Sequence, residues 1–106
     1  MIKYVETKDK KLPINYGMNA LANYSELRGV SINDALNLDM SKMNLMDYFT
    51  LIYVGVKDGA RVAKVDCEFA SIDEFLDYAD ENKNVVSEIA DIFADYGKGG
   101  GDSKKK

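Results

Sequence analysis

The side chains that most often carry enzyme chemistry are scarce in this chain. Histidine is absent, and Cys67 is the single cysteine. Without histidine, the usual activation of a serine or cysteine nucleophile is excluded, and so are most zinc sites. One cysteine cannot form an internal disulfide, and Cys67 is interpreted as a small, buried or half-buried apolar residue. We therefore expect a protein that is not an enzyme and that holds neither a cofactor nor a metal.

Two further patterns imitate ligand sites. One has the spacing of a calcium loop and comprises Asp80, Asn82, Asn84 and Asp91. The sixth position of such a loop requires glycine, but it is Val85 here, so a break between two helices is the favoured interpretation. The other pattern, residues 97–103, is rich in glycine, but a phosphate loop also needs a strand before it and a helix after it. Neither pattern supports a ligand site.

Charge is distributed unevenly along the 106 residues, whose formal net charge is −4. Residues 1–65 have a net charge of +2, residues 66–96 of −9 and residues 97–106 of +3. The acidic segment disfavours nucleic-acid binding and favours a basic or amphipathic protein partner. No stretch has the roughly 18 apolar residues of a membrane span, and the N-terminus lacks the apolar core of a signal peptide. A cytoplasmic protein that contacts neither membrane nor nucleic acid is expected.

Any site must be positioned by elements organised around residues 44–58. The apolar residues with helical spacing in this segment are Leu45, Tyr48, Phe49, Ile52, Tyr53 and Val56. Other apolar residues flank this stripe, as expected for a helix in the centre of a core. A buried strand is the alternative, because β-branched and aromatic residues are abundant, but the pattern is longer than a typical strand. Gly59 is an expected end of the helix, although the next few residues could add another turn.

The remaining segments predict one α+β domain, mainly helical, over residues 1–97. A β-hairpin over residues 2–16, with its turn near residues 8–10, is expected to pack on about four helices. The helices are predicted at about residues 18–28, 31–37, 44–58, 72–81 and 84–96. Residues 65–70 alternate briefly, and whether they form a strand stays open. Residues 98–106 are predicted to be a flexible Gly/Lys tail.

Several of these helix ends have local signals. Gly29 follows the first helix where a left-handed C-terminal cap is common, and Ser31 is a good N-cap for the second. Ser71 and Glu74 match the capping box, in which serine and glutamate satisfy free N–H groups of the first turn. Gly97 is a predicted C-terminal cap of the last helix. The acidic residues of the helix that Ser71 begins are expected to line its solvent side.

Residues 13–31 resemble the tail assembly chaperones of long-tailed bacteriophages and prophages. The matching residues are Tyr16, Gly17, Met18, Ala20, Leu21, Glu26, Gly29 and, just beyond, Ile32. The order of the later helices over residues 2–97 is similar to that family as well. The resemblance implies a non-catalytic protein of the bacterial host cytoplasm that covers the tape-measure protein before the tail tube encloses it. The tail tube protein is a second partner that it suggests.

Methionine and tyrosine residues are the predicted partner surface. Methionine adapts to varied apolar partners, and a helix docks in a groove through apolar anchors. The predicted binding residues are Met18, Tyr24, Met40, Met43, Met46, Tyr48 and Tyr53. For any one of them, packing in the core is the simpler interpretation. A homo-oligomer is left open, and the alternative function is a small acidic adaptor or DNA-mimic regulator that binds a basic protein.

Overall fold

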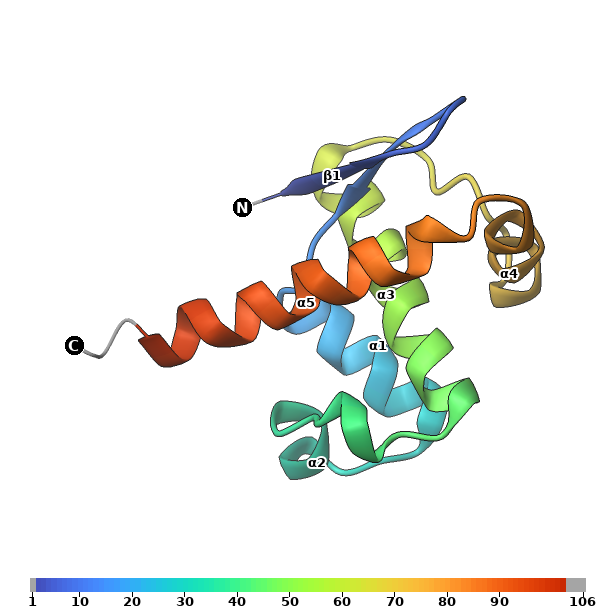
Figure 1. Ribbon diagram of the computed structural model, residues 1–106. Coiled ribbons are helices and arrows are strands. Elements are labelled where there is room, and N and C mark those ends of the chain that lie inside the picture. The colour runs from blue at the N-terminus through green and yellow to red at the C-terminus, as the bar shows by residue number, and fades with distance from the viewer. Residues whose placement is uncertain (1, 103–106) are drawn as a thin grey trace.

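The computed structural model describes the backbone of residues 2–102 and the side chains of residues 2–96. Its elements are β1 (Lys3–Glu6), β2 (Lys11–Ile14), α1 (Met18–Arg28), α2 (Ile32–Leu36), the short 3-10 helix η1 (Met40–Lys42), α3 (Leu45–Ala63), α4 (Ile72–Glu81) and α5 (Asn84–Asp102). The predicted class is confirmed, because a two-stranded N-terminal hairpin is combined with five α-helices in the described part of the chain. Figure 1 shows the hairpin at one end of the molecule and α2 at the other.

The strands β1 and β2 form the predicted antiparallel hairpin, with Val5 opposite Leu12. The turn closes where the Thr7 N–H donates to the Lys10 carbonyl at 2.8 Å. Val5, Leu12 and Ile14 point inward and are buried. This alternation of buried and exposed side chains attaches one face of the hairpin to the core.

The hairpin turn is held against α4 by a polar cluster. The Tyr78 hydroxyl donates to the Asp9 carboxylate at 3.1 Å and is hydrogen-bonded to the Thr7 hydroxyl. The Lys10 ammonium lies 2.6 Å from the Glu68 carboxylate, and this hydrogen bond raises the pKa of Lys10. The turn therefore has a defined position although it is far from the centre of the core.

The central helix is α3, as predicted, and not a strand. The Asn44 side chain caps it by accepting a hydrogen bond from the Asp47 N–H at 2.8 Å. From Thr50 to Val56 every residue is buried, with Leu51, Ile52 and Val54 fully enclosed. Other elements therefore pack around the whole circumference of the middle of α3.

Helix α3 is longer than predicted, because Gly59 does not end it. The helix continues to Ala63, and Lys64 takes the left-handed C-terminal position with φ 63°. Gly59 instead lies against β2: a Cβ atom on it would be 2.0 Å from the Pro13 carbonyl oxygen. The glycine is required by this close approach of helix and strand, and the end of the helix lies further along.

The ends of α1 and α2 follow their local signals. Gly29 has φ 67° and its N–H donates to the Ser25 carbonyl, which is the predicted C-terminal cap. The Ser31 side chain accepts a hydrogen bond from the Asp34 N–H and begins α2. Helix α2 ends at Leu36, so it is slightly shorter than predicted. Two helices are thereby joined by a tight turn and lie side by side.

Residues 65–70 form an irregular connection without strand structure. Helix α4 then begins at the predicted cap, where the Ser71 hydroxyl accepts a hydrogen bond from the Glu74 N–H. Glu74 reaches back one residue further than a capping box requires, because its carboxylate accepts from the Ala70 N–H at 3.1 Å. The local signal predicted the start of α4 correctly.

Helix α5 begins at Asn84 and continues through Gly97 to Asp102. The described backbone of α5 therefore runs past the predicted end near Tyr96, since a glycine lowers helix stability but does not forbid a helix. The predicted flexible tail, residues 98–106, falls in part on residues 103–106, which lie outside the described residues.

One buried carboxylate connects three segments of the chain. Asp58 on α3 is 2% exposed, and its carboxylate accepts hydrogen bonds from the Asn15 side chain and the Gly17 N–H. The Arg61 guanidinium donates to the same carboxylate at 2.9 and 3.0 Å. Asn15 in turn accepts a hydrogen bond from the Tyr96 hydroxyl at 2.9 Å. The exit of the hairpin, the start of α1 and α5 are thus fixed to α3.

Candidate protein-binding grooves

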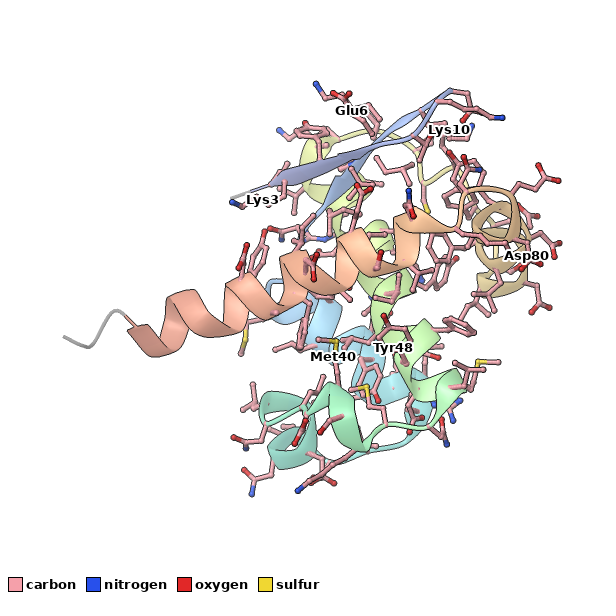
Figure 2. All side chains as sticks on the ribbon, in the orientation of Figure 1. Lys3, Glu6, Lys10, Met40, Tyr48 and Asp80 are labelled. Carbon is pink, nitrogen blue, oxygen red and sulfur yellow. The ribbon has the colours of Figure 1, made fainter. Side chains whose placement is uncertain are left out.

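The structure divides the seven predicted binding residues by their exposure. Tyr24 and Tyr53 are buried, at 2% and 5% exposed. The half-buried group comprises Met40, Met43 and Tyr48, all packed against the core. Met18 and Met46 have exposed side chains, at 72% and 43%. Figure 2 shows Met40 and Tyr48 inside the outline of the molecule, between α5 and the α2 end. The seven residues therefore do not form one surface.

Tyr24 and Tyr53 belong to the hydrophobic core, which corrects their assignment to an exposed partner surface. The Tyr53 hydroxyl donates to the Phe69 carbonyl at 3.2 Å, and its ring lies 6.0 Å from that of Phe75. Burial raises the pKa of both Tyr24 and Tyr53. A buried tyrosine that satisfies its hydroxyl inside the protein is a packing residue.

An exposed apolar groove lies between α1 and α2, and we call it the α1–α2 groove. Its apolar lining consists of Met18, Leu21, Ala22, Ile32, Ala35 and Leu36. Its volume is about 450 Å³, and Ser25 and Glu26 complete the lining. Ile32 is 74% exposed and Leu36 is 52% exposed. Three large apolar side chains, including Met18, thus lie open to solvent around one groove.

A second groove adjoins the first along α2, and we call it the α2–α5 groove. It has a volume of about 750 Å³ and shares Leu21, Ala35 and Leu36 with the α1–α2 groove. The additional lining residues are Tyr16, Leu38, Asp39, Met40, Ser41, Phe93, Ala94 and Tyr96. Met18 and Met40, both predicted for binding, therefore line two adjoining grooves that share three lining residues.

The charge in these two grooves is negative. Glu26 lines the α1–α2 groove and Asp39 lines the α2–α5 groove, and no lysine or arginine of the described residues lines either one. Hydrogen bonds from the Ser41 hydroxyl, at 2.7 Å, and from the Ser41 N–H lower the pKa of Asp39. Asp39 is therefore a stable anion at neutral pH.

A third groove lies between α1, α3 and the start of α4, and we call it the α1–α3–α4 groove. Its lining includes Leu27, Met46, Tyr53 and Ile72, and its volume is about 420 Å³. Its charged lining residues are Arg28 and Lys57, which are both cationic. The Arg28 guanidinium is paired with Asp47 at 2.6 Å, and the Lys57 ammonium lies 5.7 Å from the centre of the Tyr53 ring. The predicted residues Met46 and Tyr53 therefore belong to a groove of opposite charge.

Sequence reasoning missed Ile32 and Leu36 as surface residues. Their spacing with Ala35 is that of a buried helical stripe, and only Ala35 is buried. The spacing gives no signal that separates the exposed residues from Ala35, because all three belong to one helical pattern. Their assignment to a surface required the tertiary structure.

The described residues contain no group of three His, Cys, Asp or Glu side chains placed as metal ligands. The calcium-like pattern is a break between helices, because Asn82 ends α4 and its side chain donates to the Tyr78 carbonyl. Cys67 is half-buried, and its thiol donates to the Phe69 carbonyl. No helix among the described residues combines the length and apolar character needed to cross a membrane.

The carboxylates of α4 lie on its outer side, as predicted. Asp73, Glu74, Asp77, Asp80 and Glu81 are all exposed. Figure 2 shows Asp80 pointing away from the body of the molecule. This acidic helix face is separate from the apolar grooves and forms part of the −9 segment.

Comparisons with known proteins give no match: neither a family model, nor a curated protein, nor a solved structure is significantly similar to this chain.

Proposed function

We propose that this protein is a tail assembly chaperone of a long-tailed bacteriophage or prophage. It binds the tape-measure protein in the cytoplasm of the bacterial host and assists assembly of the tail tube, without catalysing a reaction. The tail tube protein is a second candidate partner. The proposal rests on the sequence resemblance, on the scarcity of catalytic side chains and on the exposed grooves.

One observation carries the proposal: the segment that resembles the chaperones also forms the α1 wall of the exposed apolar groove. Residues 13–31 include all of α1 and the cap of α2, and Ile32, which matches the family pattern, is 74% exposed. Met18, the first residue of α1, is 72% exposed. A chaperone must offer apolar surface to a partner, and exposed apolar patches often mark such sites.

The mechanism follows from the physical chemistry of an uncovered helical protein. A tape measure has apolar helical stripes that would associate with each other before the tube covers them. A groove with an adaptable methionine at its edge can cover stripes of differing sequence, because binding depends mainly on removal of apolar area from water. Loss of the partner to the growing tube then needs no chemical step, only competition for the same apolar surface.

Co-expression with the tape-measure protein of the same phage or prophage tests the proposal. We expect a complex that is isolated by affinity purification and that survives about 1 M salt, because salt screens surface charges strongly but does not weaken apolar contacts. Failure of purified chain and purified tape-measure fragments to associate at any salt concentration would show that the proposal is wrong.

The exposed acidic face of α4 supports a second candidate, a small acidic adaptor or DNA-mimic regulator. Its partner would be a basic protein, and the five exposed carboxylates from Asp73 to Glu81 would supply the contact. Such a complex should weaken steeply as salt rises, because surface charges are screened. The salt dependence of binding therefore separates the two functions.

A further inference from the structure

We propose that the α1–α2 groove, with its continuation into the α2–α5 groove, binds one amphipathic helix whose apolar stripe is flanked by lysine or arginine. The inference deepens the proposed function and rests on it for the identity of the natural partner. It adds the location of the docking surface and the charge that the partner must carry. Both come from the lining residues of the grooves.

The apolar contribution comes from side chains that the fold itself does not use. Met18, Ile32 and Leu36 are between 52% and 74% exposed around one groove. Binding would remove these three large side chains from water, and burial of apolar area is the main favourable term in most protein association. The α2–α5 groove adjoins it at Leu21, Ala35 and Leu36, so the two grooves together offer room for successive turns of a helix.

A helix fits this surface better than an extended peptide. Most lining residues lie in helices, whose backbone N–H and C=O groups are bonded within their own turns, so these walls offer no edge to an added strand. A partner in an apolar groove must therefore satisfy its own backbone hydrogen bonds, which an α-helix does. Its apolar anchors at i, i+3, i+4 and i+7 would lie along the groove.

Charge complementarity determines the flanks of that helix. Glu26 and Asp39 are the charged residues lining the two adjoining grooves, and both are anions. A lysine or arginine beside the apolar stripe would meet these carboxylates, whereas a glutamate would be repelled. The charged residues that line the α1–α3–α4 groove, Arg28 and Lys57, are cations. Variants in that groove therefore serve as controls for variants in the α1–α2 groove.

Two synthetic amphipathic helices test the inference with the full chain. They share one leucine stripe, and one carries lysine flanks and the other glutamate flanks. We expect the lysine helix to bind at least about ten-fold more tightly by titration calorimetry at low salt, where surface charges are least screened. The double variant Glu26→Gln/Asp39→Asn should remove most of that preference. Asparagine is as good an N-cap as aspartate, so the cap of η1 that Asp39 forms is kept.

Uncharged variants then locate the site. Ile32→Asn with Leu36→Asn should weaken binding of the lysine helix at least about ten-fold, because both apolar side chains are exposed in the groove, and their replacement should change stability little. The matched control, Leu27→Asn with Met46→Asn in the α1–α3–α4 groove, should leave it unchanged. Circular dichroism of each variant confirms that the fold is retained.

Three results would overturn the inference: no binding of either helix, equal binding of both, or binding that is lost in the control and kept in the Ile32→Asn/Leu36→Asn variant. A fourth result would also overturn it: the wild-type chain sediments as a dimer, and the Ile32→Asn/Leu36→Asn variant sediments as a monomer. The occupant of the groove would then be a second copy of this chain. Tape-measure binding that survives the groove variants would reject this site and retain the proposed function. Binding of the lysine helix without any binding of tape-measure protein would retain this site and reject the proposed function.

Discussion

Gly59 on α3 lies so close to Pro13 on β2 that a Cβ atom on the glycine would be 2.0 Å from the Pro13 carbonyl oxygen. The nearest obstacles are backbone atoms, so no side chain can rotate away. We predict that Gly59→Ala lowers the free energy of unfolding by about 3 kcal/mol, the upper range for overpacking. Urea denaturation of the variant checks this value.

The sign of that effect distinguishes close packing from ordinary helix propensity. In an unobstructed helix interior, Gly→Ala stabilises by about 1 kcal/mol. Gly17→Ala should lose less stability, because Gly17 is the N-cap of α1 and a Cβ atom there would have its nearest contact at 3.3 Å, with the Asn15 side chain. A Gly59→Ala variant that is as stable as the wild-type chain, or more stable, would show that α3 and β2 are not in close contact.

The buried carboxylate of Asp58 should be essential for stability. All of its hydrogen bonds are donated to it, by Asn15, Gly17 and Arg61. In Asp58→Asn the new NH₂ group would face another hydrogen-bond donor and could not bond to it. We therefore expect the free energy of unfolding to fall by about 3 kcal/mol. Thermal unfolding measures it, with Asp80→Asn on the exposed face of α4 as a control that should change stability by less than about 0.5 kcal/mol. Equal stability of the two variants would contradict the network.

Tyr16 should make the fold sensitive to alkaline pH. Burial, followed by the nearby Tyr48 and Tyr96, raises its pKa well above the ordinary value of 10.0. Below about pH 10 the phenol is protonated in both states, so it contributes no pH dependence. Above that pH the unfolded chain loses the proton and the native state keeps it, so the free energy of unfolding falls as pH rises.

The variant Tyr16→Phe should reduce this alkaline slope while lowering stability at pH 7. The loss at pH 7 is about 1 kcal/mol, because the hydrogen bond from Tyr16 to the Leu51 carbonyl, 2.7 Å long, is removed. Urea midpoints between about pH 8 and pH 11 measure both effects. Tyr4→Phe, at an exposed position of β1, is the control and should leave the slope unaltered. An unchanged slope in Tyr16→Phe would mean that other groups cause the alkaline unfolding.

Met43 and Met46 should respond differently to the same substitution. Met46 is exposed, so Met46→Asp should change stability by less than about 0.5 kcal/mol. Met43 is half-buried against the core, so Met43→Asp places a charge at an apolar contact and should cost about 2 kcal/mol or more. Thermal melts of the two single variants compare them directly. Equal melting temperatures would mean that the loop before α3 does not pack as described.

The elements that could be predicted are those whose causes are local. Ser71 and Ser31 begin helices because their side chains accept N–H groups of the next turn, and Gly29 ends α1 because it adopts a left-handed conformation. These causes act over a few residues and can be identified in a sequence. Gly59 has a distant cause, the backbone of Pro13, so it was given the wrong role.

The candidate site could be predicted only in part for a related reason. An apolar residue at helical spacing gives the same pattern whether it faces the core or a groove. Tyr24 and Ile32 both continue such stripes, yet Tyr24 is 2% exposed and Ile32 is 74% exposed. The difference depends on which neighbour packs on each helix, and that is a property of the tertiary structure.

The hydrogen bond from Tyr96 to Asn15 has a consequence for the kinetics of folding. It joins residues 81 positions apart, and Asn15 is bonded to Asp58, 43 positions away. Contacts between such distant residues carry a large loop-closure entropy and usually form late. We expect Tyr96→Phe to accelerate unfolding and to leave the refolding rate nearly unchanged. During synthesis on the ribosome, the hairpin would therefore receive its final anchor only after residue 96 has been made.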